Sequence, residues 1–223
     1  NEVLAKYSPD LIWFDFELQK VIPEEYQRRM FADYYNWGAR TGRETGVAMK
    51  HREIQQYTGI LDFERGREDR LTPYVWLTDT ACGPWFNNKA SPYRTADNLV
   101  DVFVDIVSKN GCMLLNVGPA ADGTIPEAAR DLLLAMGDWL KVNGPAVYGT
   151  RPWKVFGEGP TRASGGGFSE RKDPVYTARD LRFTQSPDGK AVFVFALDWP
   201  ERPFAVESMK VVAAAPDAKV TLL

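Results

Sequence analysis

The sequence contains one histidine and two cysteines among its 223 residues. A single histidine makes a histidine-rich metal site or a Ser-His-Asp triad hard to assemble from this chain. Two cysteines are too few for a disulfide framework. Because Cys82 falls on a predicted loop and Cys112 in a predicted buried strand, we expect both to be free thiols. We expect neither a metal nor a cofactor.

The chain also lacks an excess of positive charge and a long apolar run. Its 27 Lys and Arg residues are spread along the sequence and are outnumbered by 30 Asp and Glu residues. This balance argues against binding nucleic acid or an anionic membrane surface. No apolar run is long enough to span a bilayer. A neutral ligand is easier to accommodate, and the seven tryptophans include candidate sugar-binding faces, although tryptophan is also a common core residue.

The dominant pattern is an alternation of apolar strands and amphipathic helices. Strands that end in polar residues are predicted at 11–14, 45–50, 74–80 and 112–116. Helices are predicted at 23–40, 95–109 and 126–143, because apolar residues recur there at helical spacing behind a proline or a capping residue. This alternation predicts a parallel α/β sheet or barrel.

The alternation covers too little of the chain for a whole barrel. An eight-stranded barrel needs roughly 200 to 250 residues, so we predict that residues 1–156 form the C-terminal half of a (β/α)8 barrel. Residues 157–173 are rich in Gly, Ser, Arg and Lys and are predicted to be a linker or mobile loop. Period-two patterns then predict the start of a β-sandwich domain over 174–223, with a hairpin around the turn at 187–190 and further strands at 209–212 and 220–222.

Asp15 is the first candidate for chemistry. It follows the apolar strand at 11–14 without a polar break, and α/β barrels place catalytic groups where their strands end. The alternative interpretation is that Asp15 caps the turn or helix that follows.

The stretch at 7–15, Tyr-x-Pro-Asp-Leu-Ile-Trp-x-Asp, resembles the nucleophile segment of the α-L-fucosidases of glycoside hydrolase family 29. Three later segments resemble the same family in the same order: Asp-Phe-Glu-Arg-Gly at 62–66, Trp-x-Thr-Asp-Thr at 76–80, and Ser-Lys-Asn-Gly-x-x-Leu-Leu-Asn-Val-Gly-Pro at 108–119. The resemblance implies a barrel enzyme that removes terminal α-L-fucose with retention, with Asp15 attacking the anomeric carbon. It also implies that an N-terminal half, absent from this sequence, carries the His and Trp residues that bind most of the sugar.

A retaining glycosidase needs a second carboxylate as its acid and base. Other branches of the family have a Glu for this purpose at the position of Leu77, and a leucine cannot transfer a proton. We therefore predict Glu64 as the acid/base, with Glu68 and Asp69 as rivals. Residues 67–70 have the pattern of a solvated charge run on a loop, whereas the neighbours of Glu64 suggest a chain held against the protein body.

Further residues are candidates for binding the substrate. Trp76 and Trp85 are predicted to offer sugar-stacking faces, with a core role for Trp76 equally open, and His51 is a candidate to bind a hydroxyl group, although a lone histidine is more often structural. The expected partners are a fucosylated oligosaccharide or glycoconjugate and the other half of the barrel; the oligomeric state stays open. The resemblance alone suggests a periplasmic or extracellular location.

Two other functions remain open at this stage. Half a barrel exposes strand edges, so the chain is alternatively a catalytically inactive fragment or carbohydrate-binding remnant. Because a fold does not determine a substrate, a retaining glycosidase of another sugar class is the second alternative.

Overall fold

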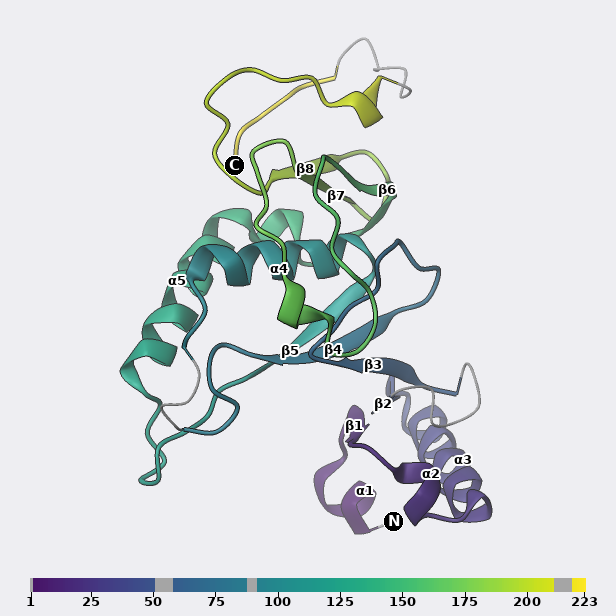
Figure 1. The fold of residues 1–223 in the computed structure, drawn as a ribbon. Helices are drawn as coiled ribbons and strands as arrows, with labels where there is room; N and C mark the ends of the chain where they lie inside the picture. Colours follow the sequence, from purple (N-terminus) through teal and green to yellow (C-terminus); the bar gives the residue numbers. More distant parts are fainter. Residues whose placement is uncertain (1, 51–57, 88–91, 211–217) are drawn as a thin grey trace.

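The chain folds into two sheets with helix α4 (Ala96–Ser108) between them (Figure 1). The structure is a computed structural model that describes residues 2–50, 58–87, 92–210 and 218–223. One sheet is five-stranded and parallel, and the other is three-stranded and antiparallel. Among the described residues, no helix is long and apolar enough to cross a membrane.

The parallel sheet follows the order of the sequence. Its strands are β1 (Leu11–Phe14), β2 (Gly46–Lys50), β3 (Ile60–Glu64), β4 (Trp76–Ala81) and β5 (Gly111–Asn116). Because all four pairings are parallel and between consecutive strands, every carboxyl end lies at the same edge. This curled sheet with helices on its outer side is the C-terminal half of a (β/α)8 barrel, as the sequence predicts.

Capping and turn residues in the sequence mark the ends of α3 and the start of α4. The N-terminal helices are α1 (Glu2–Tyr7), α2 (Leu18–Val21) and α3 (Glu24–Thr41), and α5 (Glu127–Asn143) follows β5. Helix α3 starts behind Pro23 with two glutamates in its first turn and ends at Gly42 in the left-handed region, at φ 68°. At the start of α4, the Thr95 hydroxyl accepts a hydrogen bond of 3.1 Å from the Asn98 amide, which is the cap expected from the sequence.

The two faces of the parallel sheet are covered differently. Outward-facing residues such as Ile12 and Val47 pack with the buried aromatic side chains Phe31 and Tyr34 of α3. On the inner face, Leu114 is 47% exposed and Cys112 is exposed as well. The strand at 112–116 was expected to be buried on both faces, but its inner face is open because only half of the barrel is present.

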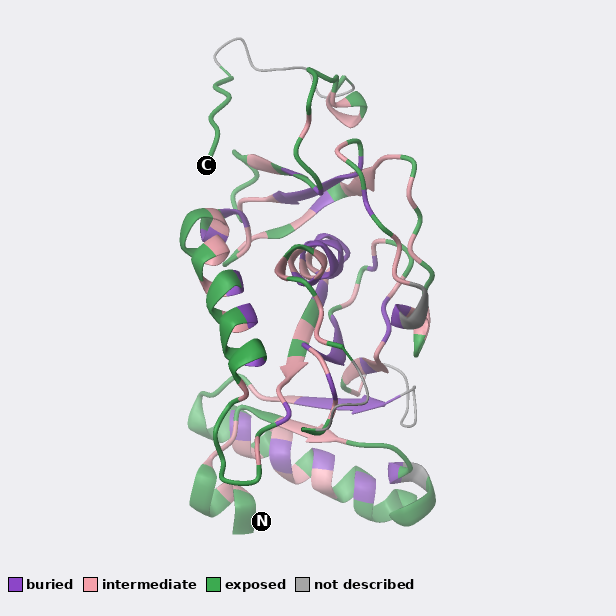
Figure 2. Cartoon of the chain, turned by 60° about the vertical axis from the view of Figure 1, so that its left-hand side comes forward, coloured by how far each residue is buried: buried purple, intermediate pink, exposed green. Residues whose placement is uncertain are grey.

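Helix α4 packs against both sheets and has more buried residues than the longer helices α3 and α5. Leu99, Val102, Val104 and Ile106 are each at most 2% exposed, and Val104 packs with Tyr176, Phe195 and Leu197 beyond the parallel sheet. Figure 2 shows α4 nearly end-on, with part of the helix coloured as buried. The short 3₁₀ helix η1 (Gly144–Ala146) joins α5 to the second sheet.

The second sheet begins earlier than the sequence suggested. It contains β6 (Arg151–Glu158), β7 (Leu181–Gln185) and β8 (Val192–Ala196), so a boundary after residue 156 falls inside β6. The hairpin around the turn at 187–190 is confirmed by the β7–β8 pairing. The strands predicted at 209–212 and 220–222 are wrong where they are described: η3 (Glu207–Met209) is a 3₁₀ helix and 220–222 has no regular structure, while residues 211–217 lie outside the described residues.

Residues 159–173, which we call the docked segment, form the first part of the connection from β6 to β7 and contact the parallel sheet (Figure 1, green). Of the predicted linker or mobile loop over 157–173, residues 157 and 158 belong to β6, and the rest contacts the end of β3. The segment is joined to the turn after β3 by an isolated β-bridge between Arg67 and Gly166. The carboxylate of Glu170 forms ion pairs with Arg65 and Arg94. These ion pairs join residues far apart in the sequence, so composition alone misses them.

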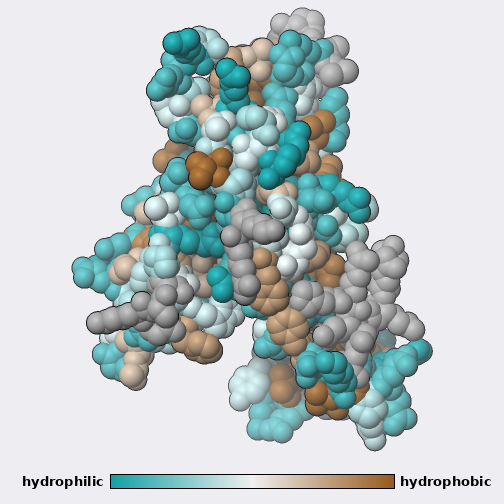
Figure 3. Space-filling view, in the orientation of Figure 1, coloured by the Kyte–Doolittle hydropathy of each residue, from teal (hydrophilic) through white to brown (hydrophobic). Residues whose placement is uncertain are grey.

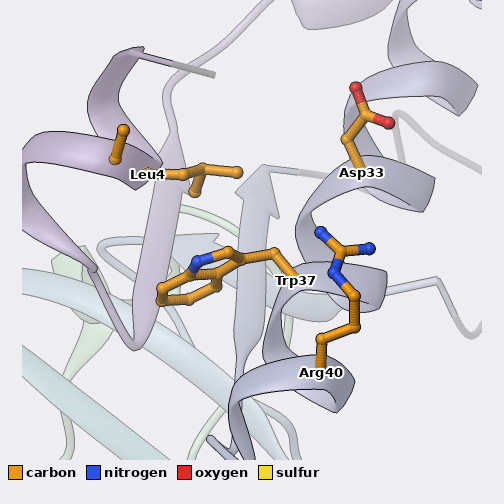
Figure 4. A pocket seen from close by; sticks show the side chains of 5 residues that line it. Leu4, Asp33, Trp37 and Arg40 are labelled. Atoms are coloured by element: carbon orange, nitrogen blue, oxygen red, sulfur yellow. The ribbon is translucent and has the colours of Figure 1, made fainter.

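Two hollows open on the outer side of the sheet, beside α1 and α3. One, of about 300 Å³, is lined by Leu4, Ala5, Asp33, Trp37 and Arg40; Figure 4 shows the Leu4 side chain of α1 opposite Trp37 of α3. The other, of about 490 Å³, includes the outward-facing Ile12 and Phe14. Neither is lined by the candidate catalytic carboxylates, which lie on the inner face.

Candidate active site

Asp15 directly follows β1 and lies on the inner face by strand alternation from Trp13. Asp15 is exposed, and its Oδ1 accepts a hydrogen bond of 2.8 Å from the Phe16 amide. This is the local contact that the turn-capping alternative expects. The contact leaves the carboxylate open to the barrel mouth, as a nucleophile requires, so the structure is compatible with both roles.

Glu64 is the last residue of β3 rather than a loop residue. The sequence did not predict this strand. Glu64 is half-buried, and its Oε2 accepts a hydrogen bond of 2.6 Å from Lys50 Nζ. Since β1 and β3 flank β2, Asp15 and Glu64 occupy the same edge and the same face of the sheet, two strands apart.

Between the two carboxylates lies Lys50, at the carboxyl end of β2. Its side chain is fully buried, and its ammonium group pairs with Glu64, with Asp79, and with Asp62 at 3.0 Å. The same ammonium lies 5.0 Å from the centroid of the Trp13 ring. Burial opposes the charge of Lys50, but the hydrogen bonds that it donates to Asp79 and Glu64 and the charge of Asp62 outweigh burial and raise the pKa of Lys50.

This cluster contains more carboxylates than cations, which affects where its protons reside. Burial, helped by the charges of Asp62 and Glu64, raises the pKa of Asp79 to about 7 although Lys50 opposes the shift. Within the described part of the chain, Asp79 Oδ2 is buried without a hydrogen-bond partner. A carboxyl group that holds a proton near neutral pH therefore lies beside the candidate acid/base.

The sequence assigned no role to Lys50, Asp62 or Asp79. A signal was available, because each is a charged residue in a short strand that also contains large apolar residues, and the parallel register places Lys50 beside Asp62 and Glu64 beside Asp79. Trp13 completes the group by donating a hydrogen bond of 2.6 Å from Nε1 to Asp62 Oδ2.

The alternative acid/base candidates, Glu68 and Asp69, lie beyond a sharp turn at Arg65, whose φ is 44°. Glu68 accepts a hydrogen bond of 2.8 Å from the Tyr74 hydroxyl, and Asp69 is exposed. The solvated charge run expected at 67–70 is wrong for Arg67, which is 1% exposed and pairs with Asp105 and Asp173. Glu64 stays the predicted acid/base, and its place at a strand end supports that prediction.

The three predicted binding residues have different positions. Trp76 has no exposed surface; its ring packs edge-on against Phe63, and its Nε1 donates to the Lys109 carbonyl at 3.1 Å. Its sugar-stacking role is therefore wrong in this structure, and the core alternative holds. Trp85 is half-buried on the loop after β4. Its backbone carbonyl accepts a hydrogen bond of 2.8 Å from the Asn116 side chain at the end of β5. His51 lies outside the described residues.

Both cysteines are free, as expected, with Cys82 buried and Cys112 exposed. In the ranges 2–50, 58–87, 92–210 and 218–223, no group of three or more His, Cys, Asp or Glu residues is arranged to hold a metal ion. The carboxylates of Asp62, Glu64 and Asp79 are each paired with the Lys50 ammonium.

Known proteins resemble this chain over most of its length. The family model described as "Alpha-L-fucosidase" matches residues 1–145. The plasma α-L-fucosidase of Rattus norvegicus is 29% identical over 219 residues, covering 89% of this chain and 41% of that protein. A solved α-L-fucosidase structure is 28% identical, with a TM-score of 0.71 over 90% of this chain and 41% of its own.

A further solved structure, the Thermotoga maritima α-fucosidase in complex with fucose, is 26% identical with a TM-score of 0.64, covering 86% of this chain and 39% of that one. The chain thus spans about two fifths of the relatives that it matches. The family model covers well over half of the chain, in the region that contains Asp15 and Glu64. The chain therefore belongs to the α-L-fucosidase family.

Proposed function

We propose that the protein containing this chain removes terminal α-L-fucosyl residues from glycans or glycoconjugates with retention of anomeric configuration. One observation carries the proposal: a carboxylate directly follows β1 and another ends β3, both at the same edge of the sheet, and Lys50 is paired with the second, Glu64. The family match and the fucose complex of the T. maritima relative favour fucose over another sugar class.

The reaction would proceed in two balanced steps. Asp15 attacks the anomeric carbon while the glycosidic C–O bond breaks, and Glu64 gives its proton to the departing oxygen. Water then attacks the anomeric carbon of the glycosyl-enzyme, the bond to Asp15 breaks, and the water's proton returns to Glu64. Asp15 and Glu64 thus return to their initial protonation states.

The proposed site needs a complete barrel. In the described part of the chain, no strand pairs with the outer edges of β1 and β5, and Leu11 and Leu114 on the inner face are about half exposed. We infer that the other half of the barrel pairs with these edges and supplies the remaining contacts to the sugar.

The test compares Asp15→Asn and Glu64→Gln in the protein with a complete barrel. Asp15→Asn should abolish turnover of every α-L-fucoside. Glu64→Gln should strongly slow a substrate with a poor leaving group but spare the first step with 2,4-dinitrophenol, which needs no protonation. NMR of the first product should show the α anomer; an initial β anomer would refute retention. Asp131→Asn, an exposed carboxylate of α5, is the matched control.

The open inner face also supports the alternative of an inactive remnant that only binds carbohydrate. That alternative predicts no turnover by the wild-type protein and sugar binding that persists in Asp15→Asn. Calorimetry with L-fucose and a turnover assay on the same preparations distinguish the two functions.

A further inference from the structure

We propose that Glu170, in the docked segment, is a positioning residue for Glu64. The inference rests on the proposed function, because it assigns to the segment between β6 and β7 the task of fixing the acid/base of the barrel. Glu170 does not touch the inner face in this structure; it acts through the residues that follow Glu64 and Asp79.

The backbone of the docked segment is bound along the turn after β3. The Phe168 amide donates to the Glu64 carbonyl at 2.6 Å, the Glu170 amide donates to the Arg65 carbonyl at 3.1 Å, and the Gly166 amide donates to the Arg67 carbonyl at 2.7 Å. Three carbonyl groups at the carboxyl end of β3 are thus satisfied by one distant segment. The position of the Glu64 backbone therefore depends on that segment being docked.

The side chain of Glu170 adds a second set of contacts. It is 9% exposed, and its carboxylate accepts hydrogen bonds from Arg65, from the Thr80 hydroxyl, and from Arg94 at 2.9 Å. Arg65 directly follows Glu64, and Thr80 directly follows Asp79. One buried carboxylate thus joins the ends of the two strands that carry the candidate acid/base and its proton-holding neighbour.

The turn held by Glu170 has an unfavourable backbone conformation. Arg65 has φ of 44° and Phe168 has φ of 57°, both in the left-handed region that a residue with a side chain seldom adopts. Such residues persist where surrounding contacts hold them, and they cluster at functional sites. Without the ion pair to Glu170, Arg65 is expected to relax and to shift the adjacent Glu64.

A shift of Glu64 would affect proton transfer more than other steps. A general acid must lie within hydrogen-bonding reach of the leaving oxygen, and a misplacement of about 1 Å can cost about 100-fold in rate. The loss should therefore appear with substrates whose leaving group must be protonated and should nearly vanish with those that leave unaided.

The experiment measures kcat/KM of Glu170→Gln in the complete protein, with a fucosyl disaccharide and with 2,4-dinitrophenyl α-L-fucoside. We expect a fall of roughly 10- to 100-fold on the disaccharide and little change on the activated substrate. In a Glu64→Gln background, Glu170→Gln should cause no further loss, because the group that it positions is already gone. If Glu170→Gln does not fold, Arg65→Gln removes the same ion pair from a side chain that is 39% exposed and should give the same pattern.

The control is Asp180→Asn. Asp180 holds the start of the docked segment by accepting a hydrogen bond from the Thr161 hydroxyl, and it accepts another from Thr177, which lies beyond the segment. No described contact joins Asp180 to β3 or β4. It should lower thermal stability without any dependence on the leaving group. An equal fall on both substrates for Glu170→Gln, or additive losses in the double variant, would overturn the inference alone. If Glu64→Gln itself shows no leaving-group dependence, the assignment of Glu64 fails, and this inference fails with it.

Discussion

Trp76 and Trp85 show how the same residue type can differ in burial nine positions apart. Trp76 points outward from β4 into a core with Val102 and Ile106 of α4, whereas Trp85 lies half-buried on a loop at the carboxyl edge. The sequence left both uses open for Trp76, because an aromatic residue in a short strand can face either side of the sheet.

We predict that Trp76→Ala lowers the free energy of unfolding by roughly 3 to 5 kcal/mol, because it empties a buried site. Trp85→Ala should instead raise the KM for an α-L-fucoside and leave stability nearly unchanged. Denaturant titration and steady-state kinetics on both variants check this. A normal KM for Trp85→Ala would remove Trp85 from the substrate-binding residues.

Asp101 on α4 couples stability to pH. Burial, followed by the charge of Asp97, raises its pKa to about 7 from an ordinary value of 3.8. Since the folded state binds this proton more tightly, the stabilisation is fully present below pH 3.8 and is lost as pH rises through 7. The wild-type protein therefore loses stability from this group between about pH 4 and pH 7.

We predict that Asp101→Asn removes this loss and is more stable than wild type at pH 8, by an amount on the order of 2 kcal/mol. The advantage should shrink towards pH 4. Urea denaturation at both pH values measures it, and Asp97→Asn, an exposed neighbour in the first turn of α4, should show a much smaller effect. A constant difference between wild type and Asp101→Asn across this range would contradict the prediction.

At the scale of elements, the docked segment depends on a close approach of two backbones. A Cβ atom on Gly66 would overlap the Gly166 carbonyl and lie 2.9 Å from the Gly167 Cα. Because both obstacles are backbone, neither can rotate away. Gly66 therefore allows the segment to reach the end of β3.

We predict that Gly66→Ala displaces the docked segment and destabilises the protein by roughly 1 to 3 kcal/mol. Hydrogen exchange should accelerate at the amides of Phe168 and Glu170, which donate to the turn after β3. Gly137→Ala on α5, where an added Cβ meets nothing within 4 Å, should instead be neutral or stabilising. Unchanged exchange at Phe168 in Gly66→Ala would show that the backbones have room to adjust.

The elements that could be predicted from the sequence are those specified by nearby residues. Pro23 and the following glutamates start α3, and Thr95 caps α4. Strand β3 was missed because its five residues include Asp62 and Glu64, which are paired with Lys50 from another strand. The docking of Glu170 depends on Arg65, 105 positions away, and no local pattern encodes such a contact.

At the scale of the whole molecule, the parallel sheet has a covered outer face and an open inner face. In the space-filling view, a hollow separates the lobe of α1–α3 from the lobe at the start of α5 (Figure 3). Strands β1 and β3 of the parallel sheet carry Asp15 and Glu64 at one edge. The same sheet that carries the candidate catalytic groups leaves apolar inner residues such as Leu114 exposed in this structure, and we propose that the rest of the barrel covers them.

Leu114 and Leu134 provide a matched test of this arrangement. Both are large exposed residues in this structure, at 47% and 61%, but Leu114 lies on the inner face of β5 and Leu134 on the outer surface of α5. In the protein with a complete barrel, Leu114→Glu should lower the free energy of unfolding by roughly 2 to 3 kcal/mol, because it buries an unpaired carboxylate.

Leu134→Glu, in the same protein, should change stability by less than about 0.5 kcal/mol, as surface substitutions usually do. Denaturant titrations of the two variants measure the difference. Equal and small effects would mean that no further strands cover the inner face. Since an uncovered face cannot exclude water from Asp15 and Glu64, that result would favour the carbohydrate-binding remnant over the enzyme.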